Sequence, residues 1–311
     1  MKVSLNELEH GVSLCSTTVS REVELALSVC SACPDACVIH RLVKPRLVAT
    51  ARDTYLTPLI SQPVNDDFLH GASLELGQDV TYGWGRAAPN GSSVGDDEST
   101  LKTRMAALLK SFAGGDRDGK AKRLFDAFLS KKSDVEVFTD AALDKAAAAH
   151  ENLISFFERT VSTPGTKGAD PKKIRIHQAL KDADWDVNRI RPITDLGVPA
   201  FNNGSKALST GDFDNGLGVM VNGWQYVFVQ AERYEYVSCK KQYEIDLKFV
   251  FYDVFGLDDD DLIEFGAAST WGTTAQQGIT AWWQLQHQFN HAPLLTRALV
   301  RKTFVASTKD G

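Results

Sequence analysis

The segment QYEIDLKFVFYDV, residues 242–254, constrains the fold of this chain more than any other stretch. Its alternate residues from Tyr243 to Phe251 are apolar, and the charged residues Glu244, Asp246 and Lys248 lie between them. Because successive side chains of a strand point to opposite faces of a sheet, this pattern predicts a half-buried antiparallel strand. Helices on one side of the sheet are then needed to cover its apolar face.

The surrounding sequence predicts further strands and a hairpin. Asn222-Gly223 separates GLGVMV from WQYVFV, and Asn-Gly tolerates the positive φ values of a type I′ turn. RYEYVS follows, TAWWQLQHQF predicts a helix with Thr280 at its cap, and PLLTRALVRKTFV predicts a closing strand. We therefore expect an α+β fold, in which an N-terminal mixed or helical region precedes a C-terminal antiparallel β meander with flanking helices.

The middle of the chain carries helical patterns. In LKTRMAALLKSF the apolar positions recur at i, i+4, i+7, i+8 and i+11, which is one helix face. KAKRLFDAFLSK predicts a second helix. A third is expected after Thr139-Asp140, and Asp170-Pro171 predicts the start of a fourth, KKIRIHQALKDA. The apolar stripe of the third helix is Leu143, Ala147, His150, Ile154 and Phe157.

Composition divides the chain into four segments. Residues 82–100 are rich in Gly, Ser, Asn and Pro, which predicts a linker or a long surface loop. They follow an N-terminal mixed segment, 1–81, and precede a helical segment, 101–183, and a C-terminal α+β module, 184–311. A chain of 311 residues, 43% hydrophobic and 24% charged, is long enough for one large domain or two ordinary ones.

Charge and hydropathy exclude several classes of protein. The formal net charge of −6 argues against binding of nucleic acid by the whole chain. No apolar run approaches the roughly 18–20 residues that span a bilayer, and the N-terminus lacks the apolar core of a signal peptide. We expect a protein made in the cytosol that acts elsewhere only without a cleaved signal. Motifs of serine hydrolases, P-loop NTPases, dinucleotide-binding enzymes and kinases are absent from the sequence.

The cysteines form a sparse, odd set, which argues against a disulfide scaffold. They are Cys15, Cys30, Cys33, Cys37 and Cys239. Cys30, Cys33 and Cys37 lie with His40 within eleven residues, as zinc ligands do, but the two ligand pairs stand closer together than in known structural sites. We favour buried thiols and predict no metal site. A zinc or iron–sulfur site and a disulfide formed after export are the alternatives.

Four consecutive acids, Asp258–Asp261, follow the strand segment. Asp258 is well placed to accept from the first amides of a helix, and further acids favour its positive end. The spacing of an EF-hand calcium loop is absent. We predict a helix cap, with a divalent-cation site or an acidic edge that faces a partner as alternatives.

Two loop segments and one histidine pair carry the remaining polar candidates. KDADWDVNRIRP, residues 181–192, places three aspartates around Trp185 and then two arginines, which line a polar cleft or form a surface ion-pair patch. GDFDNGLG, residues 211–218, supplies acids for ligation or catalysis, or is ordinary loop chemistry. His287 and His291 have the spacing of a zincin helix, but residue 288 is Gln rather than the Glu that acts as base, so a structural role is favoured.

The C-terminal half carries a recognisable succession of motifs. They are DWD (184–186), FNNG…DFDNGLGVMVNG (201–223), VFGLDDDDL (254–262), ITAWWQLQHQ (279–288) and APLLTRALV (292–300). Over roughly residues 175–306 this succession resembles a bacterial family catalogued as domain of unknown function 3289. Its members are found beside type VI secretion spike proteins and are regarded as candidate antibacterial effectors. A polar residue, often His, precedes FGLD in the family, whereas this chain has Val254.

The resemblance implies a type VI secretion-associated antibacterial effector. The N-terminal and helical parts are then expected to engage a spike or adaptor protein, the C-terminal module to be toxic, and a cognate immunity protein to bind it. For the mechanism we favour hydrolysis of a cell-envelope component by carboxylate acid–base chemistry, without a cofactor. Asp184, Asp186 and Asp214 are the candidate acid and base, and His287 is a candidate polarising or proton-transferring group.

Two other classes remain as alternatives. One is a non-enzymatic binding or membrane-perturbing protein, in which Trp271, Trp282 and Trp283 form a recognition surface. The other is an immunity or chaperone protein of a secretion cluster, whose acidic face binds a basic toxin.

Overall fold

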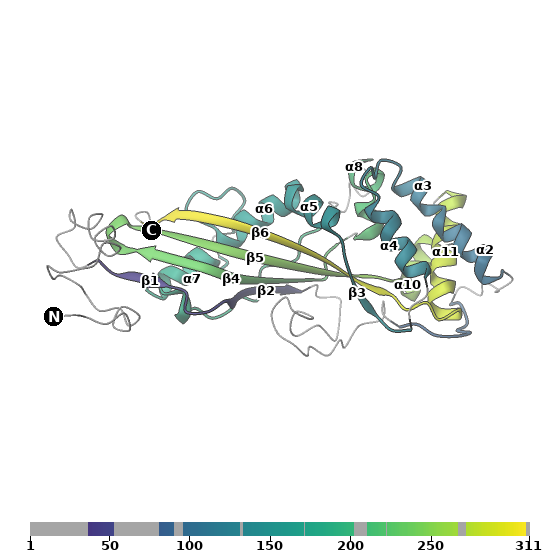
Figure 1. The fold of residues 1–311 in the computed structure, drawn as a ribbon, viewed down its shortest axis with the longest axis horizontal. Coiled ribbons are helices and arrows are strands. Elements are labelled where there is room, and N and C mark those ends of the chain that lie inside the picture. Colours follow the sequence, from purple (N-terminus) through teal and green to yellow (C-terminus); the bar gives the residue numbers. More distant parts are fainter. Residues whose placement is uncertain are drawn as a thin grey trace.

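The computed structural model describes residues 37–52, 81–89, 96–130, 133–170, 172–201, 210–221, 223–266 and 272–308. The molecule is elongated, with a long sheet along its axis and helices along one side and at one end (Figure 1). The strands are β1 Ile39–Arg41, β2 Arg46–Arg52, β3 Glu136–Thr139, β4 Tyr226–Val237, β5 Gln242–Phe255 and β6 Leu294–Ser307. The larger helices are α2 Glu98–Ala106, α3 Leu108–Phe112, α4 Lys120–Leu129, α5 Ala141–Ala149, α6 Glu151–Val161, α7 Ile176–Asp182, α10 Asp259–Phe265 and α11 Thr273–Gln288.

The strand order β1-β4-β5-β6-β3 confirms the α+β class. The long strands β4, β5 and β6 form an antiparallel meander, β2 also pairs with β4, and β3 pairs with β6 in parallel. The sheet therefore takes β1 and β2 from residues 1–81, β3 from residues 101–183 and the meander from residues 184–311. One continuous cluster of buried side chains likewise includes residues from all three stretches.

Strand β5 confirms the predicted alternation but is buried on both faces over most of its length. Its apolar face, from Tyr243 to Phe251, is at most 1% exposed. The half-buried prediction is wrong for Leu247–Phe255, where every residue is buried. The cause is a second, smaller apolar cluster on the opposite face, made by Tyr226, Phe228, Val250, Tyr252, Val254 and Leu295.

The middle segment forms the expected helices with one correction. Leu101, Met105 and Leu108 are completely buried, as the periodicity predicts. The third predicted helix is two helices, because His150 has an extended backbone (φ −72°, ψ 131°) between α5 and α6. This break changes the helical phase, so Ile154 is 39% exposed and the buried face of α6 begins at Leu153.

The predicted hairpin at Asn222-Gly223 is wrong. GLGVMV contains the short helix α9, Leu217–Met220, rather than a strand, and Asn222 itself lies outside the described residues. The tight connection of the sheet is instead the turn at Ser238–Lys241 between β4 and β5. Two helix starts also differ from expectation: α7 begins at Ile176 rather than after Asp170, and Thr280 lies inside α11.

The acid run forms the predicted cap. The Asp258 carboxylate accepts from the Asp261 amide at 2.9 Å, and the Asp261 carboxylate accepts from the Asp258 amide at 3.1 Å. This reciprocal pair is a capping box at the start of α10, which satisfies amides that have no partner inside the helix.

Within the described part of the chain, no helix is long and apolar enough to cross a membrane.

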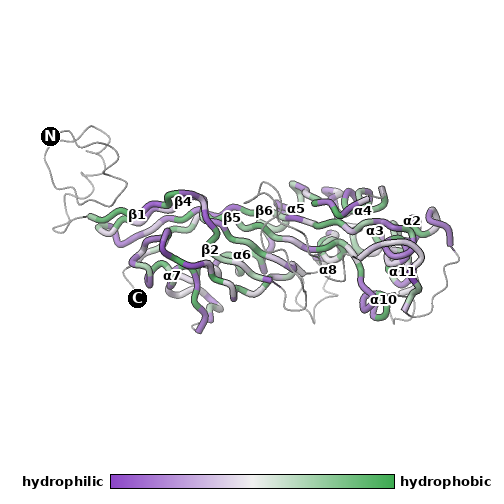
Figure 2. The backbone as a smooth tube through the Cα atoms, turned by 90° about the horizontal axis from the view of Figure 1, so that it is seen from below, coloured by the Kyte–Doolittle hydropathy of each residue, from purple (hydrophilic) through white to green (hydrophobic). Residues whose placement is uncertain are grey.

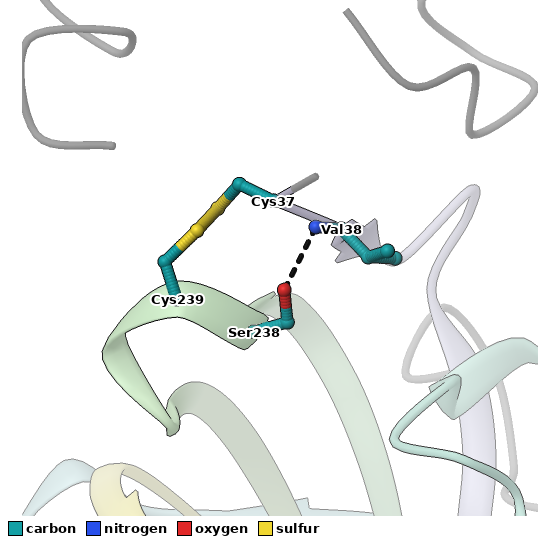
Figure 3. Close-up of a disulfide and its surroundings, with 4 residues drawn as sticks. All are labelled: Cys37, Val38, Ser238 and Cys239. Carbon is teal, nitrogen blue, oxygen red and sulfur yellow. Dashed lines mark hydrogen bonds between the residues drawn. A yellow bond between two sulfur atoms is a disulfide. The ribbon is translucent and has the colours of Figure 1, made fainter. Parts of the chain in front are cut away.

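A disulfide joins Cys37 to Cys239, 202 residues apart in the sequence (Figure 3). Beside it, the Ser238 hydroxyl accepts from the Val38 amide at 2.8 Å, and β1 then pairs with β4. The predicted buried thiol is therefore wrong for Cys37. A disulfide was among the alternatives for the cysteine cluster, and its partner, Cys239, is distant in sequence. Cys15, Cys30 and Cys33 lie outside the described residues.

Candidate functional site

A polar cleft lies beside α7. Its volume is about 560 Å³, and its walls come from α7, residues 172–174 and residues 189–195. The charged side chains that line it are Lys172, Asp182, Arg189, Arg191 and Asp195. Three of these residues belong to the segment 181–192, for which the sequence left a polar cleft and a surface ion-pair patch open. The structure has both a cleft and an exposed ion pair, Arg189–Asp184, at this place.

The cleft has an excess of positive charge. Arg189 pairs with Asp184 at 3.1 Å, and Asp195 pairs with Arg175 at 3.0 Å. The side chains of Lys172 and Arg191 have no carboxylate partner among the described residues. Two cations are therefore available to an anionic ligand, and they lie in the same cleft as two carboxylates, Asp182 and Asp195.

A strained turn leads from α7 into this cleft. Asp184 and Trp185 both have positive φ angles, of 54° and 64°. Such a conformation costs roughly 1–2 kcal/mol for each non-glycine residue, so the surroundings must hold it. The Trp185 amide donates to the carbonyl of Leu180 at 2.6 Å, and the Tyr234 hydroxyl donates to the carbonyl of Trp185 at 2.7 Å.

Aromatic packing fixes the same turn against the sheet. The Trp185 ring stacks on Tyr236 and Tyr243, with centroid separations of 5.7 and 5.9 Å. His177 of α7 completes the cluster, because its Nδ1 lies 3.0 Å from the Tyr243 hydroxyl. Burial, together with the nearby Lys181 charge, lowers the pKa of His177. The DWD motif is thus a rigid turn with Trp185 as its anchor.

The four predicted site residues do not form one constellation. Asp184 is largely exposed and pairs with Arg189, whereas Asp186 accepts from the amide of Asn188 at 2.9 Å as a helix cap. Both lie beside α7. Asp214 ends α8 (Thr210–Asp214), and His287 is on α11. In two perpendicular views α7 lies at the end of the sheet away from α8 and α11 (Figures 1 and 2).

His287 has a structural environment. It is 1% exposed, and its Nε2 donates to the carbonyl of Leu257 at 2.8 Å. Its Nδ1 faces the guanidinium of Arg86 at 3.4 Å, and Arg86 also binds Asp259 at 2.5 Å. Burial, with a contribution from Arg86, lowers the pKa of His287. These bonds join the segment around Arg86 to α11 and α10.

The NGLG motif docks its segment onto the helices. The carbonyl of Asn215 accepts from the buried Lys120 ammonium at 2.7 Å, and the carbonyl of Asp214 accepts from the Gly115 amide at 2.7 Å. Gly216 has a φ of 85°, and a Cβ built there would lie 2.7 Å from the Cβ of Ala121. Only glycine fits this close approach, so the motif has a packing role.

Two further expectations concern tryptophans and metals. Trp282 is 5% exposed and Trp283 is completely buried, so they do not form a recognition surface, and Trp271 lies outside the described residues. No group of three or more potential metal ligands occurs in the ranges that the structure describes. Of the cysteine cluster those ranges include Cys37, which is in the disulfide, and His40, which stacks on Tyr236.

Sequence reasoning missed two residues of the cleft. Lys172 and Asp195 lie outside the segment 181–192 and reach the cleft only because the chain folds back on both sides of α7. A local motif does not contain that information.

No protein-family model, curated protein or solved structure matches this chain.

Proposed function

We propose that this protein is a type VI secretion-associated antibacterial effector that binds an anionic component of the target cell envelope in the cleft beside α7. The charge of the cleft supports this proposal most directly, since Lys172 and Arg191 have no carboxylate partner within the described residues. The cleft also lies beside the DWD motif, since Ala183 and Arg189 on either side of that motif line it, and DWD is among the motifs that resemble the effector family.

The chemistry that fits the cleft is hydrolysis by carboxylates. Asp182 and Asp195 line it, and Asp184 pairs with Arg189, which also lines it. One carboxyl group acts as general acid and another as general base, while Lys172 and Arg191 hold the anionic substrate. Asp214 and His287 lie on other elements, so this version of the proposal assigns them no role in the cleft.

The experiment compares bacterial growth when the full chain is expressed in the cytosol and with a periplasmic signal attached. Killing only from the periplasm is expected, because the substrate is an envelope component. Arg191→Ala and Asp182→Ala should each abolish killing, whereas Lys122→Ala, an exposed cation on α4, should leave it unchanged. Killing from the cytosol alone would exclude an envelope substrate.

Liposome leakage distinguishes this proposal from membrane perturbation. A hydrolase that acts on a specific envelope component should release no dye from liposomes made of phospholipid alone. Dye release at the concentrations that kill would favour a membrane-perturbing protein. Full-length protein that is folded, harmless in both compartments and protective against a toxin would favour the immunity class.

A further inference from the structure

We propose that a second, smaller cavity beside the cleft is a binding site for a phosphate group. Its volume is about 260 Å³, and it lies among the C-terminal part of α6, residues 168–170, Lys173, Arg175 and residues 196–199. It adjoins the cleft along the chain, since Lys172 lines the cleft and Lys173 lines this cavity. This proposal does not rest on the proposed function, because it is argued from a different cavity and its test measures phosphate binding by the purified protein rather than killing.

Three cationic side chains line this cavity. Arg175 is only 8% exposed, and its Nη1 donates to the carbonyl of Ile174 and to Asp195, both at 3.0 Å. A guanidinium has five N–H donors, and the other three have no acceptor among the described residues. Arg159 and Lys173 form no ion pair within those residues either. The cavity therefore combines a fixed guanidinium with two unpaired charges.

Backbone donors add to these charges. The amides of Leu196, Gly197 and Val198 donate no hydrogen bond within the described part of the chain, and all three residues line the cavity. Gly197 has a φ of 72°, so the chain turns sharply at this point. Consecutive free amides at such a turn are a common device for binding anions.

Little negative charge in the cavity opposes the binding of an anion. Asp170 is the carboxylate that lines it, and its Oδ1 already accepts from the Lys172 amide at 2.9 Å. The nearby Asp195 is paired with Arg175. The ligand thus meets an excess of positive charge and of hydrogen-bond donors.

The number of positive charges in the cavity favours a phosphate ligand over a carboxylate ligand. One guanidinium satisfies a carboxylate, whereas a phosphate dianion has more acceptor positions and twice the charge. Phe156 and Pro199 form apolar walls, and the volume leaves room for only a small substituent on the phosphate. The ligand class is therefore inorganic phosphate or a small phosphate monoester.

The test is titration of the full-length protein with inorganic phosphate in an isothermal calorimeter at low salt, with acetate at matched ionic strength for comparison. Saturable binding of phosphate that is at least tenfold tighter than that of acetate is expected, and it should weaken as sodium chloride is raised. The double variant Arg159→Ala/Lys173→Ala should bind at least tenfold more weakly. Its thermal unfolding should match the parent, because both side chains are exposed.

Lys122→Ala is the matched control, because this exposed cation on α4 does not line the cavity. It should change phosphate affinity by less than twofold. Lys173→Ala in the cavity and Lys172→Ala in the cleft then locate the phosphate between the two sites. Three results would overturn the proposal: no saturable binding, unchanged affinity in the double variant, or a larger loss in Lys172→Ala than in Lys173→Ala. The last of these would place the phosphate in the cleft instead. Binding of glycerol 3-phosphate but not of inorganic phosphate would show that the substituent, rather than the phosphate, is recognised.

Discussion

The ammonium group of Lys120 lies 2.8 Å from the carboxylate of Asp116, and the two side chains are only 6% and 3% exposed. The same ammonium donates to the carbonyl of Asn215, and the second carboxylate oxygen accepts from the Ala121 amide. This buried pair joins the start of α4 to the NGLG segment.

Removal of one partner of this pair should strongly destabilise the protein. Lys120→Met leaves Asp116 buried without its counter-charge, which typically costs about 3–5 kcal/mol. Urea denaturation of the variant measures the loss. The double variant Lys120→Met/Asp116→Asn should recover part of it, since no charge then remains buried. A single variant within 1 kcal/mol of the parent would show that the pair is not buried in solution.

Gly216→Ala should destabilise the protein by about 1–3 kcal/mol, for two separable reasons. The new Cβ approaches Ala121, and the φ of 85° is unfavourable for alanine. Adding Ala121→Gly removes the clash but not the backbone strain, so it should restore only part of the stability. Gly211→Ala is the control, because a Cβ at that position meets nothing within 4 Å. The midpoints of thermal unfolding of the parent and the three variants measure these differences in stability.

Reduction of the Cys37–Cys239 disulfide should lower stability by about 2–4 kcal/mol, because the bond closes a very long loop. Cys239→Ser should reproduce the effect of a reductant, and reductant should then have no further effect on that variant. Hydrogen exchange should increase first at Ile39–Arg41, because among the described strands it pairs with the end of β4 alone. Equal unfolding midpoints with and without reductant would contradict this prediction.

Stability should fall as the pH falls below about 6.5, the ordinary pKa of histidine. The pKa values of His177 and His287 are lowered in the fold, mainly by burial, so the unfolded chain takes up protons first. Their contribution is therefore complete above pH 6.5 and is lost as the pH falls towards their folded pKa values. Urea midpoints at pH 8.0, 6.5 and 5.5 measure the slope, and His287→Gln should reduce it.

Asp258→Ala should cost about 1 kcal/mol, because it removes half of the capping box of α10. Asp260→Ala, in the same turn but exposed and outside the box, should cost less than half as much. Chemical denaturation of the two variants compares them directly. Equal losses would mean that the favourable interaction is only that of acids with the helix end.

Prediction from the sequence pattern succeeded for features that depend on residues close together in the chain. The alternation in β5, the stripe of Leu101, Met105 and Leu108, and the cap at Asp258 all depend on residues a few positions apart. Prediction from the pattern failed where one residue changes the phase of a helix, or where tertiary packing decides between a helix and a strand. His150 interrupts a stripe that continues through it, and GLGVMV contains the helix α9, whose N-cap Gly216 packs closely against Ala121.

For the candidate site, the sequence left a polar cleft or a surface ion-pair patch open at residues 181–192 and did not give all the residues that line the cleft. Asp182, Arg189 and Arg191 belong to that segment, whereas Lys172 and Asp195 do not. The predicted grouping of Asp184 and Asp186 with Asp214 and His287 assumed a proximity that spacing in the sequence does not determine. α7 and α11 lie at opposite ends of the sheet (Figure 1).

The sequence by itself determined the class of this protein: an antiparallel meander with helices, a capped α10 and amphipathic α2 and α4. These follow from the periodicities of the backbone, which act over a few residues. Only the tertiary structure decided that β1 and β2 pair with β4, that Cys37 meets Cys239 and that cations from both sides of α7 share one cleft. Such contacts depend on burial of apolar surface between segments far apart in the chain, and no local pattern specifies which segments meet.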